Sequence, residues 1–196
     1  MVSTTFPWIS FLSYIIIMAY TPGPNNIMSM NNAKNVGFKK SMVFNLGIFT
    51  GFLIVMILCL IFSTILFVAV PRIHFPMKIL GASYMLYLII KTIVPQKEHE
   101  IKNNNGSFII GLFLQLINPK LIIYGITAMS SYILPYYNEI PVLLLFSFLL
   151  SFMGFTSVIC WALFGSIFSK LFSKHKRILN IIMAILLLYC IVSLFI

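Results

Sequence analysis

The sequence predicts an all-α integral membrane protein with six transmembrane helices. Of its 196 residues, 61% are hydrophobic and 8% are charged, and the mean hydropathy is +1.06, well above the values of soluble domains. The apolar residues also gather in runs of the length that a helix needs to cross a bilayer, about 20 residues. Inside the hydrocarbon each backbone N–H must bond within its own segment, so these runs are expected to be helical.

Clusters of Lys, Pro, Asn and Gly separate the apolar runs. In chain order, the helices are expected at Phe6–Met30, Val43–Val70, Pro76–Val94, Phe108–Leu134, Val142–Phe172 and Ile178–Ile196. Three helices in each half mean that the second half enters the membrane from the opposite side, as in an inverted repeat. We therefore expect one transmembrane transporter domain over residues 1–196, with repeats at about 1–95 and 107–196 and a cytoplasmic linker at about 96–106.

The basic residues predict the orientation. A net charge of +10 would suggest nucleic-acid binding in a soluble protein, but here most of the charges lie in the first, third and fifth loops. These charges are Lys34, Lys39, Lys40, Lys91, Lys97, Lys102, Lys170, Lys174, Lys176 and Arg177, whereas the second and fourth loops carry Arg72 and Lys78. Short basic loops stay in the cytoplasm, so both termini are expected outside it. No nucleic-acid partner is expected.

Two of the expected helices are interrupted near their middle. The first contains TPGPNN at Thr21–Asn26, and the fourth contains NPK at Asn118–Lys120. Proline removes a backbone donor and clashes with the preceding turn, so carbonyls before each break and N–H groups after it are left free. Paired discontinuous helices at corresponding positions of two halves are typical of the substrate site of a secondary transporter.

The chemistry at the breaks suits a small zwitterion. The half-helix after Pro24 presents its positive end, and Asn25 and Asn26 add donors and acceptors. Lys120 is the one charge expected at mid-membrane, where insertion costs about 2.5–3.5 kcal/mol, and the three acids of the chain lie in predicted loops. Lys120 is therefore expected either to meet a substrate carboxylate or to bond carbonyls of the opposite break. A substrate ammonium can meet free carbonyls, Asn side chains or an aromatic face.

The expected site lies between the two breaks. Its core set is Pro22, Gly23, Pro24, Asn25, Asn26, Asn118, Pro119 and Lys120. Gly51 and Gly154 are expected to allow close helix approach beside it. The further candidates are Asn45 and Gln115, with Tyr20 and Tyr124 as aromatic faces.

Several other activities do not fit these residues. No confident membrane segment holds a His or a pair of acids for intramembrane proteolysis, and metal-type spacing and a phosphate-binding loop are absent, so no enzyme, metal or cofactor is expected. A proton carrier of the usual Asp, Glu or His type is not visible either, so titration of Lys120 and transport down the substrate gradient both stay open. A membrane scaffold and a passive channel stay open as alternative functions.

The motifs resemble those of a known family. TPGPNNIMSMNNAKNVGFKKS is similar to the signature of the LysE/RhtB family of bacterial amino-acid exporters, and GASYMLYL and NPK resemble its third and fourth helices. The resemblance implies amino-acid export across the bacterial inner membrane, with proton antiport as the assumed coupling. GFLIVMILC, LIIYGITAMSSYILP, CWALFGSIFSKLF and LLLYC resemble a subgroup that exports cysteine and O-acetylserine. Homoserine, threonine or a basic amino acid are alternative substrates, and a homodimer stays open.

Overall fold

A computed structural model of the chain describes residues 5–62 and 107–171, with scattered helical positions at 79–90 and 181–192. The described part is all-helical, as predicted. Its elements are α1 (Trp8–Tyr20), α2 (Pro24–Val36), α3 (Phe38–Ile61), α6 (Phe108–Leu116), α7 (Pro119–Thr127), the π-helix η1 (Ala128–Ile133) and α8 (Ile140–Leu171). The expected helices Pro76–Val94 and Ile178–Ile196 lie mostly outside the described residues, and the linker at 96–106 lies wholly outside them.

Two of the described helices are long and apolar enough to cross a membrane, namely Phe38–Ile61 and Ile140–Phe168. Phe108–Leu116 and Pro119–Ile133 together form a third candidate span that is bent by 60° at the residues between them. Helix α1 is apolar but shorter. These helices fit the multi-pass membrane protein that the composition predicts.

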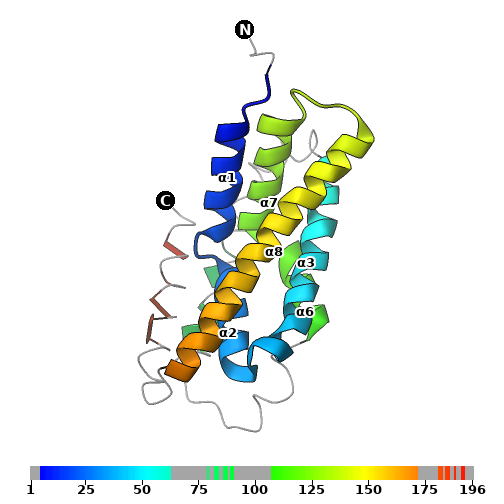
Figure 1. Ribbon diagram of the computed structural model, residues 1–196. Coiled ribbons are helices and arrows are strands. Elements are labelled where there is room, and N and C mark those ends of the chain that lie inside the picture. Colours follow the sequence, from blue (N-terminus) through cyan, green and yellow to red (C-terminus); the bar gives the residue numbers. More distant parts are fainter. Residues whose placement is uncertain are drawn as a thin grey trace.

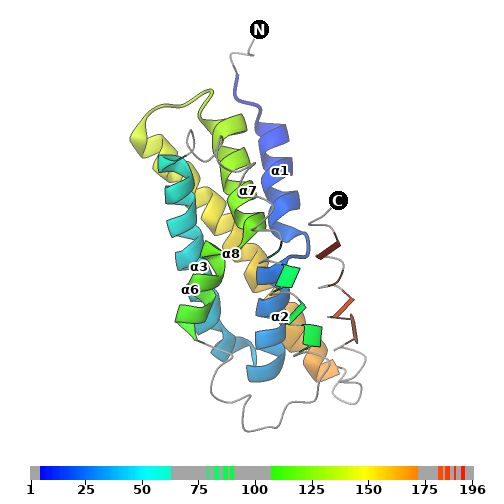
Figure 2. The same ribbon diagram turned by 180° about the vertical axis from the view of Figure 1, so that it is seen from behind.

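Two long helices span the bundle, and each short helix lies in one of its two halves. Helices α3 and α8 run along most of its length, and α8 crosses the front diagonally (Figure 1). The short helices α1 and α7 lie side by side in the half that holds the N-terminus, whereas α2 and α6 lie in the other half. The view from behind shows the same division (Figure 2). The chain interruptions after α1 and after α6 therefore both lie near the middle of the bundle.

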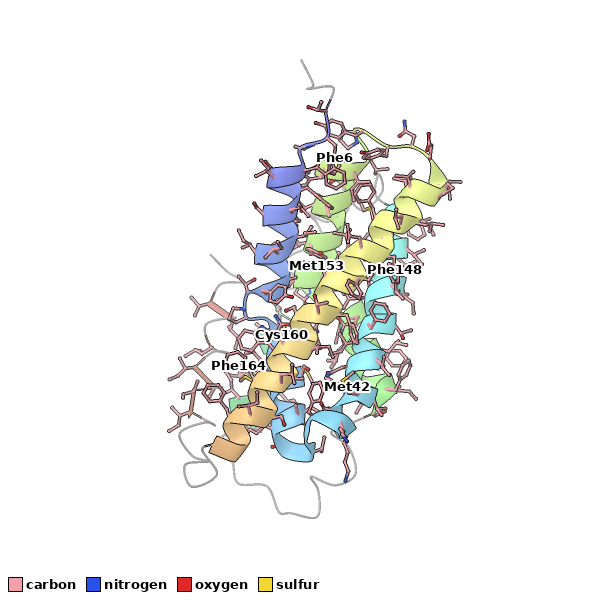
Figure 3. The ribbon with its side chains drawn as sticks, viewed as in Figure 1. Phe6, Met42, Phe148, Met153, Cys160 and Phe164 are labelled. Atoms are coloured by element: carbon pink, nitrogen blue, oxygen red, sulfur yellow. The ribbon has the colours of Figure 1, made fainter. Side chains whose placement is uncertain are left out.

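Aromatic rings fill the end of the bundle near the N-terminus. Phe6, which Figure 3 labels at this end, lies 5.3 Å from the Phe11 ring and 5.6 Å from the Phe146 ring, measured between centroids. Deeper in the same half, Tyr14 of α1 stacks on Tyr124 of α7 and on Tyr132 of η1, with centroids 6.0 and 5.4 Å apart. This packing joins α1 to α7, η1 and α8.

The turn between α2 and α3 is tighter than the sequence predicts. The predicted helices end at Met30 and begin again at Val43, because the residues between them are polar. In the structure α2 continues to Val36 and α3 starts at Phe38. Gly37 reverses the chain with a φ of 84°, a conformation that glycine adopts more easily than other residues. Lys34, Lys39 and Lys40 thus lie at helix ends, where polar side chains do not interrupt a helix.

Helices α3 and α6 approach each other closely enough for their backbones to touch. A Cβ added at Gly47 would clash with the backbone of Phe108, and one added at Gly111 would clash with the carbonyl of Phe44. Small residues permit such contacts in membrane bundles. The same applies to α8 and α2, where a Cβ at Gly165 would meet the carbonyl of Met30.

Substitution of Gly111 by Ala is expected to destabilise the bundle. The added methyl group can only be accommodated if α3 and α6 move apart, and overpacking of this kind costs about 1–3 kcal/mol. The unfolding temperature of the purified protein in detergent should fall by several degrees. Val43→Ala, at an exposed position of α3, serves as the control. An unfolding temperature of Gly111→Ala equal to that of Val43→Ala would contradict the backbone contact.

Candidate functional site

The first break lies between Tyr20, the last residue of α1, and Pro24, the first residue of α2. Proline suits this first helical position, because its missing N–H would have no helical partner there. The break leaves carbonyls at the end of α1 without their helical donors. The side chain of Asn26 supplies one donor: its Nδ2 donates to the carbonyls of Ala19 and Thr21, at 2.9 and 3.0 Å.

Helix α8 supplies further donors to the carbonyls of this break. Ser157 Oγ donates to the carbonyl of Ala19 at 2.8 Å, and Trp161 Nε1 donates to that of Tyr20 at 3.3 Å. The Tyr20 hydroxyl in turn donates to Thr156 at 3.2 Å. These α8 residues lie on the stretch between Met153 and Cys160 and just beyond it (Figure 3). Sequence reasoning missed them, and their proximity to Gly154 was the only available signal.

The second break lies between Leu116, which ends α6, and Pro119, which begins α7. Asn118 caps α7, and its Oδ1 accepts a hydrogen bond from the backbone N–H of Lys120 at 3.1 Å. Asparagine is among the preferred residues at this position, since it satisfies a donor that the helix leaves free. The helix N-terminus is thereby held at the bend between the two segments.

Lys120 connects the two breaks. Its Nζ donates to the backbone carbonyl of Thr21 at 2.8 Å and to the Thr21 hydroxyl at 2.9 Å. The sequence leaves two partners open for Lys120, a substrate carboxylate or carbonyls of the opposite break. In the structure Lys120 bonds a carbonyl of the opposite break. A Cβ at Gly23 would press against the Lys120 side chain, so glycine leaves room for the lysine to cross.

A pocket lies between the breaks, with about 370 Å³ of empty space, its open mouth included. Most of the expected core set lines it, together with Tyr124 and Gly154. The expected residues in the lining are Gly23, Pro24, Asn25, Asn26, Asn118, Lys120, Tyr124 and Gly154. The lining also contains four apolar residues that the sequence did not single out, Met18, Ala19, Phe52 and Leu121. Three of these lie within about two turns of a break, which is the signal that could have found them.

The other expected residues lie outside the lining. Pro22 and Pro119 belong to the breaks themselves, and Tyr20 bonds to α8. Gln115 lies behind Asn25: Asn25 Nδ2 donates to Gln115 Oε1 at 2.5 Å, and Gln115 Nε2 donates to Asn25 Oδ1 at 3.2 Å. A Cβ at Gly51 would clash with the Gln115 side chain. Gln115 and Gly51 therefore position Asn25.

Asn45 lies away from the pocket. It is fully buried on α3, and its Oδ1 accepts a hydrogen bond from Ser29 Oγ of α2 at 2.7 Å. Two of the cysteines are also placed: Cys59 is buried and Cys160 is exposed, and both are free thiols. Cys190 lies outside the described residues, and within them no cluster of His, Cys, Asp and Glu could hold a metal ion.

The chain is similar to known membrane transport proteins over almost its whole length. The model of the LysE type translocator family matches residues 16–196. The cysteine/O-acetylserine efflux protein of Escherichia coli strain K12 is 39% identical over 187 residues, which cover 95% of this chain and 96% of that protein. The protein of the same name from Shigella flexneri serotype 5b matches with the same identity and coverage. No solved structure matches the chain. Because the family match extends over nearly all of its residues, the chain belongs to the LysE type translocator family.

Proposed function

We propose that this protein exports small neutral amino acids, cysteine and O-acetylserine in particular, from the bacterial cytoplasm. The observation that carries the proposal is the pocket whose lining combines both chain interruptions with the ammonium group of Lys120. The names of the relatives, which describe cysteine and O-acetylserine efflux, support the choice of substrate.

The proposed architecture has six spans in two inverted repeats. In it, α1 with α2 and α6 with α7 and η1 each form one broken span, and the expected helices Pro76–Val94 and Ile178–Ile196 complete the two halves. Lys34, Lys39 and Lys40 support a cytoplasmic position for the α2–α3 turn, because basic residues are retained on that side. The outer half of the bundle then contains α1 and α7, the cytoplasmic half contains α2 and α6, and both termini lie outside.

The pocket offers partners for both charges of a zwitterion. The substrate carboxylate would bind Lys120 and the positive end of α7, which begins at Pro119. Once Lys120 turns toward the carboxylate, the carbonyl of Thr21 becomes free to accept a hydrogen bond from the substrate ammonium. Met18, Phe52 and Leu121 would contact the small side chain. Substrate binding thus exchanges the two bonds between Lys120 and Thr21 for two contacts with the ligand, which can couple occupancy to movement of the half-helices.

Transport is proposed to proceed by alternating access, with proton antiport as the coupling that the family resemblance implies. Among the residues that line the pocket, Lys120 and Tyr124 are the titratable ones. Lys120 is therefore the proposed proton carrier, and deprotonation of its ammonium would weaken its hydrogen bonds to Thr21, because the charge that strengthens them is lost. A homodimer is compatible with this scheme but is not required by it.

Counterflow in liposomes tests the transport proposal. Vesicles that contain the purified protein and an excess of unlabelled cysteine should accumulate labelled cysteine or O-acetylserine, with a rate that saturates. Labelled lysine should not accumulate, because no acid lines the pocket to pair with a second ammonium. Flux that rises linearly with concentration would favour a channel, and an absence of flux for all amino acids tested would favour a scaffold.

Substitution of Lys120 by Met is expected to weaken substrate binding. A hydrogen bond to a charged group contributes about 1.5–3 kcal/mol, so the half-saturating concentration should rise roughly 10- to 100-fold. Lys40→Met, at an exposed position near the α2–α3 turn, is the matched control that also removes one positive charge. A half-saturating concentration that is the same in both variants would exclude Lys120 from the site.

The Lys120→Met variant also tests whether transport is coupled to proton movement. If Lys120 carries the proton, Lys120→Met should lose transport driven by a pH gradient while it retains exchange at high substrate concentration. Uptake is measured in inside-out vesicles with and without an imposed pH gradient, and Lys40→Met again serves as the control. If Lys120→Met transports at the wild-type rate under a pH gradient, Lys120 is not the proton carrier.

A further inference from the structure

A second group of buried polar side chains lies on α2, beyond the pocket. Asn32 is 5% exposed, and neither its amide nitrogen nor its amide oxygen has a hydrogen-bond partner. Asn45, on α3, is 0% exposed, and its Nδ2 has no partner either. By contrast Asn25 and Asn26, at the pocket end of α2, are bonded to Gln115 and to the carbonyls of the break.

Three of the buried polar residues of α2 form a row along the helix. Asn25, Ser29 and Asn32 are spaced four and three residues apart, so they share one face of the helix. Ser29 connects α2 to its neighbours: its Oγ contacts Asn45 Oδ1 at 2.7 Å and the carbonyl of Val158 on α8 at 3.1 Å. Because α2 begins beside the pocket at Pro24 and ends at Val36, next to Gly37, the row leads from the pocket toward the α2–α3 turn.

Packing alone does not account for the amides of Asn32 and Asn45. A buried donor or acceptor without a partner destabilises the state that contains it, and a side chain of the same shape without polar atoms avoids that cost. Polar residues that hold membrane helices together do so through hydrogen bonds between the helices. Asn32 makes none in the described structure, and one end of the Asn45 amide makes none. These amide groups are therefore available to water or to a ligand.

We propose that Ser29 and Asn32, which continue the row beyond the pocket residue Asn25, form with Asn45 of α3 the cytoplasmic half of the transport path, closed here by the packing of α2 against α3 and α8. This inference rests on the proposed function. When α2 separates from its neighbours, water and then the substrate bond to the free amides. The chain offers two points at which α2 can move, the break at Thr21–Gly23 and the Gly37 turn.

The chemistry of the row suits the proposed substrate. Each amide has a donor and an acceptor, so it can bond the carboxylate and the ammonium of a zwitterion in turn. Uncharged groups bind each of them weakly enough to release it, whereas a buried charge would hold the opposite charge of the substrate and slow its passage. The row therefore complements Lys120, which lines the pocket but not this path.

The first test replaces Asn32 by Leu, which has nearly the same shape and no polar atoms. Purified Asn32→Leu should unfold at the wild-type temperature or above it, because two unpartnered groups are removed, while its maximal counterflow rate should fall at least tenfold. Thr50→Val, on the same helix as Asn45 but bonded to its own helix through Leu46, is the control and should change neither. A loss of both stability and transport would assign Asn32 a packing role and overturn the inference.

Two further outcomes separate the inference from the proposed function. If the wild type transports cysteine and Asn32→Leu does so at the same maximal rate, the row is not the path, although the function stands. If the wild type transports no amino acid, both fail together.

The second test measures access of water to the row. In a protein whose three native cysteines are replaced by Ser, Asn32→Cys should react with a membrane-impermeant thiol reagent in inside-out vesicles. O-acetylserine, a substrate without a thiol group, should change the rate of this labelling at least twofold. Leu46→Cys, at an exposed apolar position of α3, is the matched control and should stay unreactive. A thiol at position 32 that stays unreactive with and without substrate would overturn the inference.

Discussion

The need to satisfy backbone carbonyls inside an apolar bundle governs the arrangement of this protein. The break after α1 frees carbonyls at Ala19, Tyr20 and Thr21 from their helical donors. Side chains from three different helices bond to them: Asn26 of α2, Ser157 and Trp161 of α8, and Lys120 of α7. These contacts fix where α2, α7 and α8 meet, and the pocket is the space that remains between them.

The same contacts explain why a lysine is tolerated there. An ammonium group in an apolar environment is costly, but Lys120 reaches two oxygens of Thr21 at hydrogen-bonding distance, and Gly23 leaves space for its stem. Bonds from a flexible side chain can be exchanged for bonds from a ligand more easily than helical bonds can. A break whose carbonyls are bonded by side chains is therefore stable by itself, and under the proposed function these bonds can be exchanged for bonds to a substrate, which the bonds of a continuous helix do not allow.

Local chemistry was readable from the sequence, and long-range contacts were not. Pro24 and Pro119 act on their own helices, so the positions of both interruptions followed from residue type alone. For Lys120 the sequence left two partners open, a substrate carboxylate and the carbonyls of the opposite break, and the structure shows a bond to the carbonyl of Thr21. The roles of Ser157 and Trp161 depend on how α8 crosses the bundle, and a serine or tryptophan in an apolar run carries no signal of its partner. The tight turn at Gly37 was also hidden, because polar residues at helix ends resemble a loop.

Two kinds of buried asparagine on α2 differ in a way that separates structure from transport. Asn25 and Asn26 have partners that hold the pocket in shape, so their amides are part of the resting architecture. Asn32 has the same side chain and similar burial, but its amide has no partner among the described residues. A bundle optimised for that state alone would favour an apolar residue at position 32. An amide there fits the proposal that α2 also adopts a second, hydrated arrangement, which transport by alternating access would require.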